Sequence, residues 1–188
     1  MGQPRGFLLP LLFIALAAPL GGCSSGTDRT SAGSFTVRFG ATGAVAGAKD
    51  GSTSGVVAAS LALSGLEARR EEGIWVPVED GLPLDLGLNP SADAGGIVTL
   101  PSGLLPDGHY TALQIRISKV EPTLRNGAHA AIAPPRAGWS LIIPVDFVVA
   151  TGQSTAVDLA LRLDASFRLT DGALEFEPDI DVEGVEHG

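Results

Sequence analysis

The chain has 188 residues, of which 45% are hydrophobic, and a formal net charge of −9 at pH 7. The length is typical of a single domain and sufficient to bury a core without crosslinks. The negative charge argues against nucleic acid as a partner, and a single cysteine excludes a disulfide within the chain.

The first 22 residues carry the pattern of an export signal. Arg5 is their only charged residue, and residues 7–20 are almost wholly apolar. A basic start followed by a short apolar run is typical of signal peptides. A membrane-spanning helix needs about 20 apolar residues, whereas this run is shorter and contains Pro10 and Pro19. We therefore predict that residues 1–22 are a signal peptide.

The apolar run ends in Leu20-Gly21-Gly22-Cys23. This tetrapeptide resembles the lipobox of bacterial lipoproteins, in which the cysteine sulfur receives a diacylglycerol and the signal is cleaved just before it. The resemblance implies an exported protein, periplasmic or surface-exposed, that acyl chains on Cys23 hold on the cell membrane or the outer membrane. Which membrane and which face stay open. The alternative is an ordinary cleaved signal with a cysteine nearby.

Residues 23–33 are rich in serine, glycine and threonine, a composition typical of a flexible tether. Loss of Arg5 with the signal takes the net charge from −9 to −10. An acidic domain is repelled by an anionic membrane, so acyl chains alone would hold it there. An acidic surface also simply favours solubility.

Beyond the tether, apolar residues recur at alternate positions, which predicts strands. Phe35, Val37 and Phe39 share one face of a first strand, and residues 40–55 form a loop. Residues 57–68 keep the same period, and their phase slips at Gly65, which indicates a β-bulge. Further strands are predicted at residues 74–78, 82–86, 97–100, 110–120, 141–149 and 155–163.

Only residues 58–70 and 159–168 admit a helix as an alternative, and their apolar spacing fits a period of two better than 3.6. Turn residues recur at intervals of about one strand length, as they do in all-β sandwiches. We therefore predict a single antiparallel β-sandwich over residues 34–183, followed by a tail at residues 184–188.

The segment Leu105-Pro106-Asp107-Gly108-His109-Tyr110 leads directly into an apolar strand. It resembles the leucine-proline-x-Gly-x-Tyr turn of an uncharacterised domain family of bacterial lipoproteins. Residues 61–68, 75–78, 156–161 and 174–182 add to the resemblance. It implies a transthyretin-like or immunoglobulin-like sandwich on the envelope, and it implies no particular activity.

The last part of the chain contains five acidic residues of one parity: Glu175, Glu177, Asp179, Asp181 and Glu183. In one strand, all five carboxylates would share a face. Because Ca²⁺ takes six to eight oxygen ligands, this row is a candidate calcium site, and no cofactor other than Ca²⁺ is predicted. The alternative is a solvated strand face that discourages edge pairing.

Trp139 follows a proline-rich loop, at the point where a strand is expected to begin. An aromatic ring exposed there would suit a sugar, so Trp139 is a candidate ligand-binding residue. The alternative is packing in the core, which we expect for Trp75 and Tyr110. The histidines have no companion at metal-ligand spacing, and the chain has no nucleophile elbow, phosphate loop or dinucleotide fingerprint. No catalytic residue is predicted.

These features favour a lipid-anchored protein of the cell envelope that works as a non-enzymatic binding or structural module. Its partner would be an envelope protein or a glycan, besides the membrane itself. The alternative is a surface adhesin that depends on calcium or binds carbohydrate, through the acidic row or through Trp139 respectively.

Overall fold

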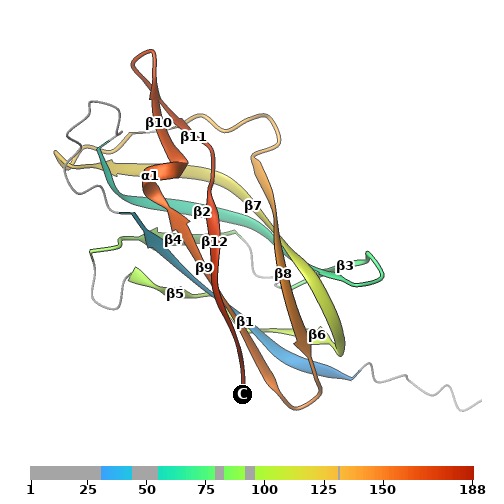
Figure 1. Cartoon of the computed structure of the whole chain (residues 1–188). Helices are drawn as coiled ribbons and strands as arrows, with labels where there is room; N and C mark the ends of the chain where they lie inside the picture. Colours follow the sequence, from blue (N-terminus) through green and yellow to red (C-terminus); the bar gives the residue numbers. More distant parts are fainter. Residues whose placement is uncertain (1–30, 44–54, 79–82, 92–95, 131) are drawn as a thin grey trace, which may run out of the picture.

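The computed structural model describes residues 31–43, 55–78, 83–91, 96–130 and 132–188. They form two five-stranded sheets packed in a sandwich-like arrangement, together with a separate two-stranded hairpin (Figure 1). The predicted all-β sandwich is therefore confirmed. The signal peptide, Cys23 and most of the tether lie outside the described residues.

The first sheet has the strand order β12-β9-β1-β5, and β6 also pairs with β1. Its strands are β1 (Ala32–Thr42), β5 (Val98–Thr99), β6 (Gly103–Pro106), β9 (Ser154–Arg162) and β12 (Ile180–His187). Strands β1 and β9 run parallel, with Ser34 opposite Ser154 and Thr42 opposite Arg162. This pair departs from the purely antiparallel arrangement predicted, because alternation within a strand carries no information about its neighbour's direction.

The second sheet has the order β3-β2-β7-β8, and β4 also pairs with β2. Its strands are β2 (Val56–Arg70), β3 (Trp75–Pro77), β4 (Leu84–Leu88), β7 (Gly108–Leu124) and β8 (Trp139–Val149). The register of β2 against β7 shifts between Leu63 and Gly65. The irregularity predicted at Gly65 is therefore confirmed, and Leu66 resumes the buried face beyond it.

Between β9 and β12 the chain forms one helical turn and a projecting hairpin. These are α1 (Leu163–Ser166), β10 (Phe167–Thr170) and β11 (Ala173–Phe176). Asp171 and Gly172 both have positive φ, at 51° and 82°, as the two central residues of a type I′ turn require. The hairpin extends from one end of the sandwich (Figure 1).

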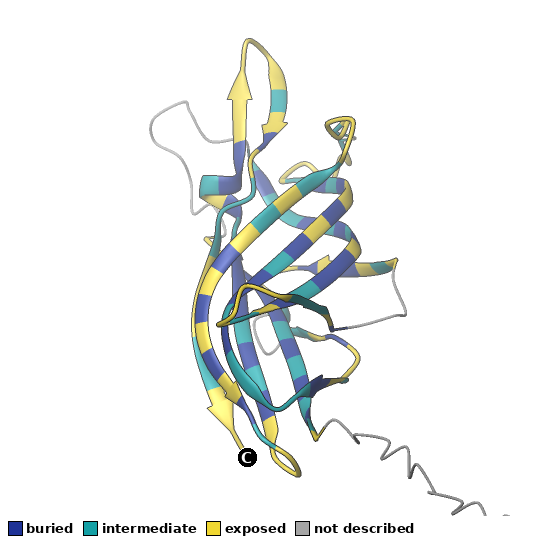
Figure 2. Cartoon of the chain, turned by 90° about the vertical axis from the view of Figure 1, so that its right-hand side faces the viewer, coloured by how far each residue is buried: buried dark blue, intermediate teal, exposed yellow. Residues whose placement is uncertain are grey.

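The core lies between the two sheets, and buried residues alternate with exposed ones along β8 (Figure 2). An aromatic stack crosses it, with ring centroids 4.9 Å apart for Phe35 and Phe147 and 5.1 Å apart for Tyr110 and Phe147. The Tyr110 hydroxyl donates to the Pro106 carbonyl at 2.8 Å. A tyrosine that bonds the backbone just upstream of its own strand is a feature of Greek-key sandwiches.

The outermost strands carry features that oppose pairing with another chain. Strand β12 exposes Asp181, Glu183 and Glu186, and its register against β9 shifts between Val182 and Gly184. Strand β8 contains Pro144, which lacks a backbone donor. Charges, bulges and prolines are common protections of a sheet edge. Strand β12 runs as far as His187, so most of the predicted tail is part of the sheet.

Candidate functional site

A groove with a volume of about 560 Å³ opens where β8 begins, beside the projecting hairpin. One wall comes from the loop that precedes β8 and the other from β11 and the residue after it. The lining residues are Ile132, Ala133, Pro134, Pro135, Trp139, Leu174, Glu175, Phe176 and Glu177. We call this the Trp139 groove. Its volume lies in the range of small-molecule sites.

Trp139 is fixed in the wall of this groove. Its indole Nε1 donates to the Phe176 carbonyl at 3.1 Å, and the two rings meet edge to face with centroids 5.1 Å apart. Phe176 in turn packs on Phe167, at 4.9 Å between ring centroids. Trp139 is partly buried. It therefore belongs neither to the deep core nor to a free surface, and its polar edge is already satisfied within the protein.

The hairpin that forms the second wall has a signal in the sequence that the alternation of apolar residues does not reveal. Asp171-Gly172 is a dipeptide that favours a two-residue hairpin turn, and Leu169 and Leu174 flank it in register. That turn brings Thr170 and Glu175 together, and the Thr170 hydroxyl donates to Glu175 Oε2 at 3.0 Å. The proximity of Trp139 and Phe176, in contrast, depends on tertiary packing.

The expectation that five carboxylates share one strand face is wrong. Glu175 lies in β11, Glu177 and Asp179 lie in the connection around Pro178, and Asp181 and Glu183 lie in β12. The chain leaves its pairing with β10 and takes up a new pairing with β9, so the alternation does not run through the whole segment. Proline favours such a break because it cannot donate to a ladder.

Most of the five carboxylates have partners. Glu177 lies 3.5 Å from Arg168, and Asp179 and Asp181 each lie 3.8 Å from Arg162. In the part of the chain that the structure describes, no three histidine, cysteine or acidic side chains are grouped so as to hold a metal ion. Calcium binding by these residues stays a prediction, and the guanidinium of Arg162 already occupies the position between two of them.

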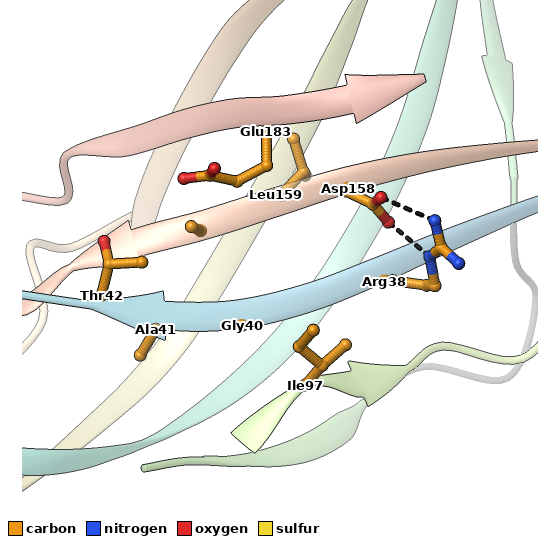
Figure 3. Close-up of a pocket in the computed structure, with 9 residues that line it drawn as sticks. Arg38, Gly40, Ala41, Thr42, Ile97, Asp158, Leu159 and Glu183 are labelled. Atoms are coloured by element: carbon orange, nitrogen blue, oxygen red, sulfur yellow. Dashed lines mark hydrogen bonds and ion pairs between the residues drawn. The ribbon is translucent and has the colours of Figure 1, made fainter. Parts of the chain in front are cut away.

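Glu183 instead lines a second cavity, of about 280 Å³, on the outer face of the first sheet (Figure 3). Its lining includes Ile97 and also Gly40 and Ala160, which are paired in the register of β1 and β9. At one end, Arg38 forms a two-point contact with Asp158 and also lies 2.7 Å from Glu186. Hydrogen bonds to Asp158 and then to Glu186 raise the pKa of Arg38. This ion cluster joins β1, β9 and β12.

His109 lies between two carboxylates at the other end of the molecule from the Trp139 groove. Its Nδ1 is 3.2 Å from Glu71 Oε2, and its Nε2 contacts Asp146. Hydrogen bonds to Glu71 and then to Asp146 raise the pKa of His109. The spacing of histidines along the chain gave no sign of this cluster, because its members come from β7, β8 and the turn after β2.

Comparison of the chain with family models, curated proteins and solved structures finds no match. The resemblance to a lipoprotein domain family therefore stays a prediction. Within the described ranges, no helix is long and apolar enough to cross a membrane.

Proposed function

We propose that this chain is an exported protein anchored to the bacterial envelope by acyl chains on Cys23, and that it acts there as a non-enzymatic binding module. The sequence support for the anchor is the tetrapeptide that ends in Cys23. Each buried methylene contributes about 0.8 kcal/mol to membrane attachment, so two or more acyl chains give a durable anchor. Ser24 to Thr30 would link the anchor to the domain.

The observation that carries this proposal is that the first strand begins at the opposite end of the sandwich from the Trp139 groove. A Cβ on Gly33 would lie 2.4 Å from the Ala150 carbonyl oxygen, so the start of β1 lies against the turn after Val149. Val149 lies ten residues after Trp139 along β8, or about 33 Å in an extended strand. Figure 1 shows the start of β1 at the opposite end of the sandwich from the β10–β11 hairpin, so an anchor before β1 would attach at the end away from the groove.

The alternative is a surface adhesin that depends on calcium or binds carbohydrate. The dispersal of the acidic residues and their contacts with Arg162 and Arg168 do not favour the calcium form. The Trp139 groove favours the carbohydrate form, which is compatible with an anchored binding module.

Mass spectrometry of the full chain, expressed in a bacterium that processes lipoproteins, tests the anchor. We expect a mature amino terminus at Cys23 that carries acyl chains, and recovery of the protein with membranes. Cys23→Ala should release the protein from the membrane fraction, whereas Ser24→Ala should not. An unmodified Cys23, or a Cys23→Ala variant that still sediments with membranes, would overturn the proposed attachment.

A further inference from the structure

We infer that the Trp139 groove binds a neutral, polyhydroxylated ligand, that is, a carbohydrate. This inference rests on the proposed role of the chain as a binding module, and it specifies the ligand class. It follows from the apolar wall of the groove, from the polar groups at its rim, and from the way both are held in place.

The apolar wall presents ring surfaces without free polar groups. Trp139 uses its only donor, Nε1, on the Phe176 carbonyl. Pro134 and Pro135 are exposed and line the same groove. A surface of this kind packs against the C–H face of a sugar ring, as indole and pyrrolidine rings both offer flat apolar area.

The rim supplies two carboxylates, Glu175 and Glu177, and each already has a partner. Glu175 accepts a bond from Thr170, and Glu177 lies 3.5 Å from Arg168. Carboxylates accept hydrogen bonds, so the hydroxyls of a sugar find acceptors at this rim. Arg168 does not line the groove, but its contact with Glu177 lowers the attraction of the rim for a cation. An apolar wall with a few hydrogen-bonding groups at its rim is typical of a site for a small polar ligand.

The two walls are held in place before any ligand binds. The bond from Trp139 to Phe176 ties β8 to β11, and Phe167 packs behind Phe176. Gly138, with φ of 71°, lies close to the Ile117 carbonyl, so the loop before Trp139 is seated against β7. A preformed site lowers the ordering cost of binding, which matters for ligands with few apolar contacts.

Fluorescence tests this assignment, because Trp75 and Trp139 are the only tryptophans in the chain. In the full mature chain with Trp75→Phe, emission reports Trp139 alone. The probes are cellotriose, maltotriose and the trimer of N-acetylglucosamine, with a lysine oligomer as the cationic comparison. We expect at least one trisaccharide to shift the emission saturably and to the same extent at low and high salt.

Calorimetry with carboxylate variants locates the binding. Glu175→Gln and Glu177→Gln should each weaken trisaccharide binding about tenfold, which is the loss of one good hydrogen bond. Glu183→Gln, a matched change in the other cavity, should leave the affinity unchanged. Far-ultraviolet circular dichroism confirms that each variant is folded.

Three outcomes would overturn the inference: no response to any trisaccharide, an equal loss in the Glu183→Gln control, or salt-sensitive binding of the lysine oligomer alone. The last result would leave the proposed binding role intact and replace only the ligand class. An unacylated Cys23, in contrast, would overturn the anchor and leave the result at the groove unaffected.

Discussion

Replacement of Tyr110 by phenylalanine isolates one hydrogen bond of the core. Tyr110 is fully buried, its ring stacks on Phe147, and its hydroxyl donates to the Pro106 carbonyl at 2.8 Å. Tyr110→Phe keeps the ring and its stacking but leaves that carbonyl without its donor. A net hydrogen bond contributes about 1 kcal/mol, and an unsatisfied buried partner adds to the cost. We expect the free energy of unfolding to fall by about 1–2 kcal/mol.

Urea denaturation followed by circular dichroism measures this loss. The slope with denaturant should not change, because the variant exposes the same surface on unfolding. In a domain of this size, the midpoint temperature should fall by about 2–4 °C per kcal/mol. Tyr110→Ala should cost more, about 3–5 kcal/mol, because it also empties the ring position. A loss below about 0.5 kcal/mol in Tyr110→Phe would refute the role of the hydroxyl in holding the turn at Pro106.

The same residue gives an independent signal at high pH, because Tyr110 is the only tyrosine in the chain. Burial raises the pKa of its hydroxyl. The folded protein therefore holds the proton to a higher pH than the unfolded chain, in which tyrosine titrates near its ordinary pKa of about 10. The stability that the buried, protonated hydroxyl contributes is complete below pH 10 or so, about the unfolded pKa, and is lost as the pH rises through the folded pKa. Absorbance of tyrosinate should appear together with unfolding, and its appearance in the folded protein at the ordinary pKa would contradict the burial.

Three further perturbations test other parts of the structure. Arg38→Met breaks the ion cluster that joins β1, β9 and β12, so it should lower the melting temperature. Added salt should reduce the difference in melting temperature between the variant and the parent chain, because salt screens the ion pairs. His109 has a raised pKa, so the stability that it contributes is complete below about pH 6.5 and is lost as the pH rises through the folded pKa. His109→Gln should flatten the dependence of stability on pH in that window. A proton NMR titration should place the pKa of His109 in the parent chain above 6.5. A Cβ at residue 103 would lie 2.0 Å from the Val78 carbonyl oxygen, so Gly103→Ala should cost about 1–3 kcal/mol in urea denaturation, whereas Gly87→Ala, which meets open space, should change stability by less than about 0.5 kcal/mol. Equal effects of the two glycine changes would contradict the packing at β6.

Local pattern was sufficient to predict most strands and one irregularity. Phe35, Val37 and Phe39 are buried as their alternation predicts, and Leu61 and Leu63 precede the slip at Gly65. The segment from residue 159 illustrates the limit of such patterns. Its alternation continues to Leu163, yet the chain makes a helical turn there, because the next residues must leave the sheet to form the hairpin.

The candidate site was only partly predictable. The position of Trp139 after a proline-rich loop predicts a candidate ligand-binding residue, but its partner Phe176 is 37 residues away in the sequence. The acidic row illustrates the opposite error, since equal parity has meaning only within one strand and Pro178 lies in the middle of the row. Contacts such as those of His109 with Glu71 and Asp146 depend on strand order, which a single sequence does not specify.

The parallel pairing of β1 with β9 has a mechanical consequence. Nine residue pairs connect the two strands over the length of β1, from Ser34 to Thr42. Tension applied at Ser31 away from the sandwich acts along the axis of β1. It therefore loads these backbone hydrogen bonds together in shear, and they do not break one after another. Detachment of β1 from β9 under tension at its amino-terminal end therefore requires this whole ladder to break together.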